Sequence, residues 1–231
     1  MNKKLKSVVA LAGVAVVLLI AGPWIYINFV KDDAPSALKI SDSTLATDST
    51  VPNISDATGS WSVTADSASI VGYRVKEILF GQSTEGVGRT KSVTGVLSIA
   101  NNSVTAASFS VEMATIMSDA AKRDAQFNGR IMDVASFPTA TFTLTAPISL
   151  PANATSGDVI SAEATGNLTL RGTTKSVTFP IEAQLSGSTF TVVGFINIVF
   201  SEWNIPQPGI PGITVDPNGL LEFSLQFSRN N

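Results

Sequence analysis

The chain contains neither cysteine nor histidine. Without cysteine it has no disulfide, no thiolate nucleophile and no residue for lipoprotein acylation, and a cysteine-ligated metal site is excluded. Without histidine it has no Ser-His-Asp triad, no imidazole metal ligand and no side chain that ordinarily titrates near neutral pH. The most common catalytic and metal-binding arrangements are therefore excluded.

Charged residues are also scarce, at 14% of the chain with a net charge of −3, against roughly 25% in an average soluble protein. The domain carries no run of basic residues, so we expect no nucleic-acid partner. Asp119, Asp124 and Asp133 are loosely spaced and have no histidine or cysteine to complete a catalytic set. We expect no catalytic residue, no metal, no cofactor and no enzymatic activity.

A long uncharged segment covers residues 7–30. As a helix it would measure about 35 Å, which is enough to cross a hydrocarbon core of about 30 Å. Three lysines lie in the first six residues, and Trp24 and Tyr26 lie near the far end, where aromatic rings favour the membrane interface. The pattern predicts a single-pass anchor in the cell membrane, with the C-terminal domain outside the cytoplasm. The alternative is a cleaved signal peptide.

Composition divides the chain into three parts. Residues 1–30 are predicted to form a cytoplasmic lysine cluster and a transmembrane anchor. Residues 31–59 are rich in Ser, Thr, Asp and Pro, with few large apolar side chains, and are predicted to be a disordered linker. Residues 60–231 are the predicted globular domain.

Apolar and polar residues alternate through most of this domain, as they do in a strand with one buried face. The alternation is clearest in four segments, 108–113, 139–145, 177–183 and 221–227. Further candidate strands are 61–66, 69–77, 92–100, 160–171 and 188–200, and turn clusters such as Asn101-Asn102 and Ser186-Gly187-Ser188 separate them. Roughly eight to ten strands at this spacing predict an all-β antiparallel sandwich or barrel.

The segment from Gly166 to Phe179 shows the pattern within a single hairpin. Two alternating segments flank a short polar turn that carries Gly172. Each segment offers one apolar face and one polar face.

Only Ser118 to Asp133 has a helical pattern. Ser118 is a candidate N-cap, and Phe127, Ile131 and Met132 would form a small apolar face. We expect one or two short turns here, at one end of the barrel. The apolar face would serve either as a plug on the core or as a lid over an internal cavity.

Four segments, in order, resemble the YceI-like family of bacterial extracytoplasmic proteins, also called lipid- or polyisoprenoid-binding proteins. They are the opening strand Trp61–Asp66, the block with Arg123-Asp124, Phe127, Met132-Asp133 and Phe137-Pro-Thr-Ala-Thr-Phe142, the block Gly166-Asn-Leu-Thr-Leu-Arg-Gly-Thr-Thr-Lys-Ser-Val-Thr-Phe179, and the closing strands with Phe200-Ser-Glu-Trp203 and Leu221-Glu222-Phe223. The resemblance implies a lipocalin-like, eight-stranded antiparallel β-barrel with one short helical segment, preceded here by the N-terminal transmembrane helix. The barrel interior would accommodate one extended isoprenoid or similar chain.

The chain departs from the family pattern near the start of the domain. Many members have a His-Ser pair and a second His there, whereas this chain has Ala68-Ser69 and Glu77. A ligand head group would therefore need other donors. A Gly-rich, charged segment at 81–91 and a Pro/Gly loop at 206–219 are expected to reshape the mouth of a cavity.

The candidate binding residues fall into two groups. An apolar chain needs an aliphatic and aromatic lining, although the same residues would serve as ordinary core. The lining candidates are Tyr73, Val75, Phe109, Val111, Met113, Phe127, Phe142, Leu144, Leu168, Leu170, Phe195 and Trp203. The candidates for a polar head group are Arg89, Lys122, Arg123 and Arg171.

Arg123 and its neighbour Asp124 could each have a structural role instead of contacting a ligand. Arg123 would otherwise form a structural ion pair with a nearby carboxylate. Asp124 is expected to orient the backbone or cap the helix rather than perform acid–base chemistry.

These observations favour a membrane-anchored extracytoplasmic protein that holds an isoprenoid, quinone or similar long-chain lipid, for transport or sequestration. The first alternative is a structural or interaction domain of the cell envelope whose barrel is filled solidly by its own side chains. A third hypothesis is a module that binds partners through exposed loops such as 204–219. The lipid and the oligomeric state stay open at this stage.

Overall fold

The computed structural model describes residues 22, 33–40, 57–64, 68–208 and 212–230. All of the described strands belong to one antiparallel sheet. The strands are β1 (Gly59–Val63), β2 (Ile70–Leu79), β3 (Gln82–Thr90), β4 (Val93–Ala100), β5 (Ser103–Glu112), β6 (Met117–Ser118), β7 (Thr139–Leu144), β8 (Ile148–Ser149), β9 (Val159–Leu170), β10 (Thr173–Ser186), β11 (Thr189–Val199), β12 (Ile213–Val215) and β13 (Asn218–Arg229). The helical segments are η3 (Met113–Thr115), α2 (Ala121–Gln126), η4 (Phe127–Ile131) and η5 (Phe200–Trp203).

Eight strands close into a barrel, in the order β1, β4, β5, β7, β9, β10, β11 and β13. The ring closes because β1 pairs with β4 on one side and with β13 on the other. At the closing seam Trp61 lies opposite Arg229, and Val63 lies opposite Phe227. The predicted antiparallel eight-stranded barrel with one short helical segment is confirmed.

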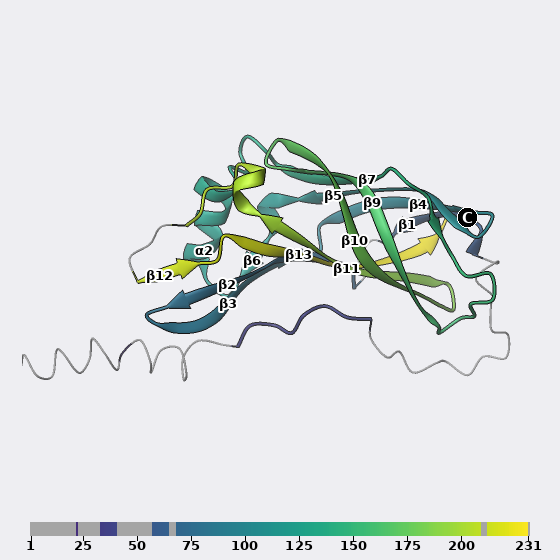
Figure 1. Ribbon diagram of the computed structural model, residues 1–231, viewed down its shortest axis with the longest axis horizontal. Helices are drawn as coiled ribbons and strands as arrows, with labels where there is room; N and C mark the ends of the chain where they lie inside the picture. The colour runs from purple at the N-terminus through teal and green to yellow at the C-terminus, as the bar shows by residue number, and fades with distance from the viewer. Residues whose placement is uncertain (1–21, 23–32, 41–56, 65–67, 209–211, 231) are drawn as a thin grey trace, which may run out of the picture.

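The last strand, β13, is shared between two neighbours on the same side. Its end at 227–229 pairs with β1, and its earlier part at 220–224 pairs with β2. The β2–β3 hairpin therefore extends the sheet beyond the closed ring at one end only. That end also carries α2 and β12, at the left of Figure 1, whereas β1 and the C-terminus lie at the right.

Tight turns connect the strands where the sequence predicted them. Arg171 and Gly172 form the β9–β10 turn with φ values of 45° and 72°, and Leu170 lies opposite Thr173. Asn101 and Asn102 have φ values of 50° and 55°. Two successive positive φ angles match the right-handed twist of a two-residue hairpin, and glycine and asparagine adopt them most easily. The hairpin predicted at 166–179 is therefore confirmed.

Most of the Gly-rich segment 81–91, which we expected to reshape the mouth and did not list among the candidate strands, is the regular strand β3. Gly88 lies opposite Tyr73. A Cβ atom at Gly88 would lie 2.4 Å from the Tyr73 ring, which is too close for any other residue. The glycines of β3 thus allow a large ring to lie flat on the sheet.

The helical segment was predicted in the correct place, but its N-cap was not. The helix α2 begins after Ala120, which makes no side-chain cap. Ser118 instead belongs to β6 and pairs with Gly88 of β3. Its hydroxyl and its backbone N–H both donate to Asp124 Oδ1, over 2.6 and 2.8 Å. Asp124 therefore orients the chain that enters the helix, as expected.

Most of the predicted anchor and linker lies outside the described residues, so these domain boundaries stay predictions. In the part of the chain that the structure describes, no helix has the length and apolar character needed to span a bilayer. From the predicted linker, residues 33–40 lie along the outside of the barrel, below β2 and β3 in Figure 1.

Large rings plug the end of the barrel at which β1 closes the sheet. Phe227 is 0% exposed, and Trp61 and Phe190 are almost as deeply buried. The ring centroids of Trp61 and Phe190 are 6.1 Å apart, and those of Phe109 and Phe227 are 5.7 Å apart. The seam between β13 and β1 is thus sealed from inside.

We predict that Phe227→Ala lowers the free energy of unfolding by roughly 3–5 kcal/mol, the usual cost of truncating a buried Phe. The measurement is equilibrium unfolding of the full chain, followed by circular dichroism. Phe80→Ala is the matched control, because Phe80 is 58% exposed, and its effect should be small. Equal effects of the two substitutions would show that the plug does not support the seam.

Candidate functional site

The barrel encloses a cavity of about 510 Å³. It is lined by the inward-facing side chains of β2, β4, β5, β7, β9, β10, β11 and β13, together with α2 and η4. Its volume lies within the range of about 300–1,000 Å³ that is typical of ligand pockets. The alternative of a barrel filled solidly by its own side chains is therefore wrong.

Aromatic rings follow one another along the cavity wall. Phe109 and Phe142 stack at 6.2 Å between centroids, and Phe142 meets Phe179 edge-on at 5.5 Å. Phe223 continues the row, 6.0 Å from Phe179. Gly166 makes room for this row, because a Cβ atom there would lie 2.3 Å from the Phe142 ring. These four rings therefore give this part of the wall a continuous apolar surface.

The structure brings most of the predicted lining residues together. Ten of them line the cavity, namely Tyr73, Val75, Phe109, Val111, Met113, Phe127, Phe142, Leu144, Leu168 and Leu170. Ile131 and Met132 of the predicted apolar helical face also line it, so this face forms part of the cavity wall. Contact of these residues with a ligand stays a prediction.

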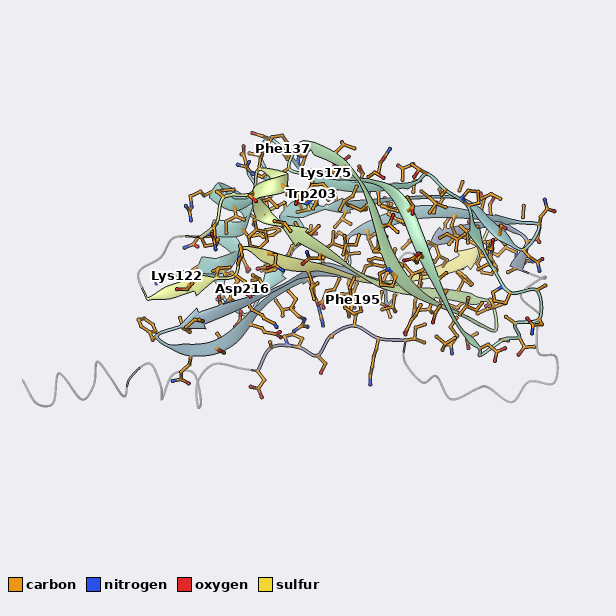
Figure 2. The ribbon with its side chains drawn as sticks, viewed as in Figure 1. Lys122, Phe137, Lys175, Phe195, Trp203 and Asp216 are labelled. Atoms are coloured by element: carbon orange, nitrogen blue, oxygen red, sulfur yellow. The ribbon has the colours of Figure 1, made fainter. Side chains whose placement is uncertain are left out.

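Phe195 and Trp203 lie elsewhere. On β11, Ile196 and Ile198 line the cavity, so Phe195 points outward by strand alternation. Figure 2 shows it on the side of the barrel that faces residues 33–40. Trp203 is 2% exposed but packs outside the cavity, where Lys175 Nζ lies 5.8 Å from its ring.

Sequence reasoning missed the inward residues of β11. The strand carries apolar residues on both faces, Val193 and Phe195 outward and Ile196 and Ile198 inward, so alternation alone did not fix which face is inside. Phe179 and Phe223, by contrast, lie in clearly alternating segments. The pattern that predicted those strands could also have identified both rings as lining residues.

A polar cluster lies at the open end of the cavity, between α2 and the inner face of β2. Arg123 Nη2 lies 2.9 Å from Glu77 Oε1, and Arg123 also pairs with Asp119 one helical turn earlier. The Glu77 side chain is only 8% exposed. This ion pair ties α2 to β2, as the structural alternative for Arg123 anticipated.

Arg123 stays charged in this position. Burial alone would lower the pKa of its guanidinium, but the carboxylates of Glu77 and Asp119 outweigh that effect and raise it. Gly86 of β3 leaves room for the Arg123 side chain. A Cβ atom at residue 86 would lie only 3.1 Å from Arg123 Nε.

The four head-group candidates lie in different places. Lys122 and Arg123 line the cavity at α2. Arg89 lies outside the barrel, where it pairs with Glu222. Arg171 lies at the β9–β10 turn, donates to the carbonyl of Asn204 and stands 5.9 Å from the Phe137 ring. Only the two residues of α2 are thus placed to meet a ligand inside the barrel.

Tyr73 connects the polar cluster to the apolar wall. Its ring stacks on Phe127 with centroids 5.0 Å apart. Burial raises the pKa of its hydroxyl to about 12, with Asp124, Asp119 and Glu77 adding to the rise and Arg123 opposing it. Tyr73 is therefore neutral at any physiological pH.

The described residues hold no group of acidic side chains arranged to bind a metal ion.

Comparison with known proteins gives one family and several similar folds. Residues 61–227 match the model of the YceI-like domain. A polyisoprenoid binding domain from Saccharophagus degradans, implicated in plant cell wall breakdown, is 14% identical, with a TM-score of 0.58 over 74% of this chain and 98% of that one. BcnA from Burkholderia cenocepacia is 22% identical, with a TM-score of 0.53 over 68% of this chain and 95% of that one. No curated protein matches the chain.

We predict that Arg123→Leu destabilises the protein by roughly 3 kcal/mol, because it leaves the Glu77 carboxylate buried without its partner. Adding Glu77→Gln should recover much of that loss, since a neutral amide is easier to bury. Unfolding free energies of both single variants and the double variant test the coupling. Strictly additive losses would contradict the ion pair.

We also predict that ionisation of Tyr73 lowers the free energy of unfolding at alkaline pH. Its folded pKa of about 12 lies above the ordinary value of 10.0. The stabilising contribution is therefore complete below pH 10 and is lost as the pH rises from 10 to 12, by roughly 2–3 kcal/mol. Unfolding measured across this range should show a shallower decline for Tyr73→Phe. Identical declines would contradict the burial of the hydroxyl.

Proposed function

The chain belongs to the YceI-like family, and from that premise we propose that its barrel binds the hydrocarbon chain of an isoprenoid, a quinone or a similar long-chain lipid. The observation that carries the proposal is the cavity. It is closed by aromatic rings at the β1 end and is walled mostly by apolar side chains. Such a space suits an extended hydrocarbon better than a polar solute, which would leave its hydrogen bonds unmade.

The family and its similar folds support the same ligand class. The protein from Saccharophagus degradans is a polyisoprenoid binding domain. An eight-stranded barrel has an interior wide enough for one slim ligand. We propose a ligand of the same class for this chain because the interior of its own barrel is open.

We propose binding, for transport or sequestration, rather than catalysis. Three charged residues at the cavity pair with one another, because Arg123 forms ion pairs with both Glu77 and Asp119. A catalytic group would need an activated nucleophile or an acid–base pair directed at the substrate. The polar cluster instead joins α2 to β2 and has a structural role.

The sequence supports a location beside the source of such a lipid. We propose that residues 7–30 anchor the chain in the cell membrane with the barrel outside the cytoplasm, because the lysines precede the apolar segment. A chain that moves from a bilayer into the barrel exchanges one apolar environment for another. Its affinity then depends on close packing in the cavity more than on escape from water.

We predict that the full chain, purified from cells and extracted with organic solvent, releases a long-chain lipid that mass spectrometry identifies. Ala164→Phe should reduce the yield strongly, because Ala164 is 4% exposed and lines the cavity, so the added ring occupies ligand space. Asn167→Phe is the control, since Asn167 is exposed on the same strand. Absence of any lipid, together with no uptake of polyprenol or quinone probes, would contradict the proposal.

A further inference from the structure

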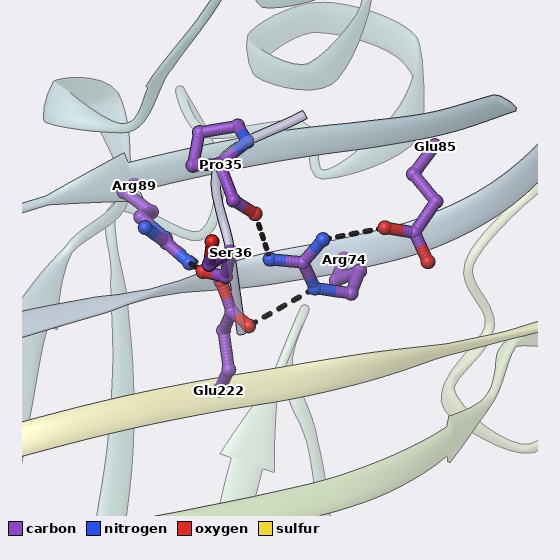
Figure 3. A network of polar contacts seen from close by, with 6 residues as sticks. All are labelled: Pro35, Ser36, Arg74, Glu85, Arg89 and Glu222. Atoms are coloured by element: carbon purple, nitrogen blue, oxygen red, sulfur yellow. Dashed lines mark hydrogen bonds and ion pairs between the residues drawn. The ribbon is translucent and has the colours of Figure 1, made fainter. Parts of the chain in front are cut away.

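An ion network lies on the outer face of the barrel, where strands β13, β2 and β3 run side by side (Figure 3). Glu222 of β13 is 0% exposed, although its side chain points away from the cavity. Arg74 Nε lies 3.2 Å from Glu222 Oε2, and Arg89 Nε lies 2.8 Å from Glu222 Oε1. Glu85 completes the network, 2.5 Å from Arg74 Nη1.

Residues 33–40 cover this network. Arg74 Nη2 donates to the carbonyl of Pro35 over 2.6 Å, and Arg89 Nη2 donates to the carbonyl of Ser36 over 2.5 Å. Two guanidinium groups face two carboxylates, so the charges balance. A guanidinium has five N–H donors, and the two backbone carbonyls accept hydrogen bonds that the carboxylates leave unmade.

The apolar surface beside the network is covered as well. Val193 points outward on β11, yet it is only 3% exposed. Leu38 and Ile40 are half-buried, although they belong to a segment without regular secondary structure. Phe195 lies opposite Glu222 on the neighbouring strand, and Figure 2 shows it on the side of the barrel that faces residues 33–40. The segment is therefore bound through its carbonyls and has two apolar side chains partly shielded from water.

The direction of this segment follows from its two contacts. Pro35 meets Arg74, and Ser36 meets Arg89, which lies opposite Gly72. Position 74 is closer than position 72 to the tip of the β2–β3 hairpin, so the chain runs away from that tip. Residue 33 therefore lies at the end of the segment nearest the tip.

The tip of the hairpin is apolar and exposed. Ile78 is 45% exposed and Phe80 is 58% exposed. The tip lies beside the open end of the cavity, because Leu79 lines the cavity and pairs with Ile213, which lines it too. A large exposed aromatic residue at the mouth of an apolar cavity is the kind of surface that meets a lipid bilayer.

We propose that residues 33–40 act as a strap that holds the open end of the barrel, with the β2–β3 tip, against the bilayer surface. The inference rests on the membrane anchor of the proposed function. It adds that the barrel has a fixed orientation, with its mouth toward the lipid rather than toward the surrounding water.

Chain lengths show what the strap changes. From residue 30, the end of the predicted anchor, to Pro35 the chain spans at most about 17 Å. A free linker of the length of residues 31–59 would have a root-mean-square reach of roughly 30 Å in any direction. When Pro35 and Ser36 are docked, the connection between anchor and barrel is therefore short instead of long and flexible. The chain then departs from the barrel on the side of the β2–β3 tip.

The test uses the full chain in vesicles of phosphatidylethanolamine and phosphatidylglycerol that contain a spin-labelled lipid as quencher. Because the chain has no cysteine, Phe80→Cys and Val159→Cys each give one fluorophore site. Val159 is 51% exposed and lies opposite Gln184, near the β10–β11 turn. We expect the lipid to quench the label at position 80 several-fold more than the label at 159.

Two insertions separate the strap from a simple tether. About twenty Gly/Ser residues, which add roughly 25 Å of reach, are placed either between residues 32 and 33 or after residue 45. A docked strap predicts that the first insertion abolishes quenching at position 80 and that the second leaves it unchanged. A free linker predicts equal losses from both insertions, which would overturn the proposal.

The remaining outcomes are also decisive. Weak quenching at position 80 in a chain that is integrated into the vesicles overturns the orientation. Self-quenching between labels at position 80, in place of quenching by the lipid, would assign the tip to a second copy of the chain and likewise overturn it. A chain that does not enter the vesicles contradicts the anchor and this orientation together, whereas lipid recovered from its barrel would still support binding.

Discussion

The division of β13 between two neighbours is the constraint on which the rest of the structure depends. One edge of the strand pairs with β11 along nearly its whole length. The other edge pairs with β2 in its first half and with β1 at its C-terminal end. One end of the sheet therefore closes into a ring, and the other end carries an extra hairpin. The closed end takes the aromatic plug around Phe227, and the other end takes α2 and the mouth. A barrel with one sealed end and one accessible end follows from this pairing.

The β2–β3 hairpin that leaves the ring is held on both faces by charged groups. Alternation along β2 directs Glu77 inward, toward Arg123 of α2, and directs Arg74 outward, toward Glu222. Buried ion pairs contribute little net stability, but removal of one partner is costly, so they specify one arrangement against others. Here they reinforce the position of a hairpin whose outer strand, β3, is otherwise joined to the rest of the described sheet only through the two-residue strand β6. Its place decides how the cavity opens.

Much of the fold followed from sequence because local and global signals agreed. Alternation in the segments that became β7, β10 and β13 identified the inward face, and paired turn residues such as Arg171-Gly172 identified hairpins. The resemblance to the YceI-like family supplied the closure of the barrel, and the family is confirmed.

The features that sequence reasoning missed depend on contacts between distant segments. The glycines of β3 concealed the strand in the sequence. Gly88 makes room for the Tyr73 ring and Gly86 for Arg123, and both reasons appear only in the folded structure. The strand β11 carries apolar residues on both faces, so alternation alone does not show that Phe195 points outward. Arg89 resembled a free cation because its partner, Glu222, is 133 residues away in the chain.

The central claim is that a hydrocarbon chain lies inside the barrel. A polyprenol analogue with a photoactivatable diazirine at its tail end tests it most directly, with the cross-linked residues identified by peptide mass spectrometry of the full chain. We predict adducts on inward residues near the closed end of the cavity, such as Ile160 and Phe190, both of which line it. Adducts confined to outward residues such as Phe195 and Val159 would contradict it.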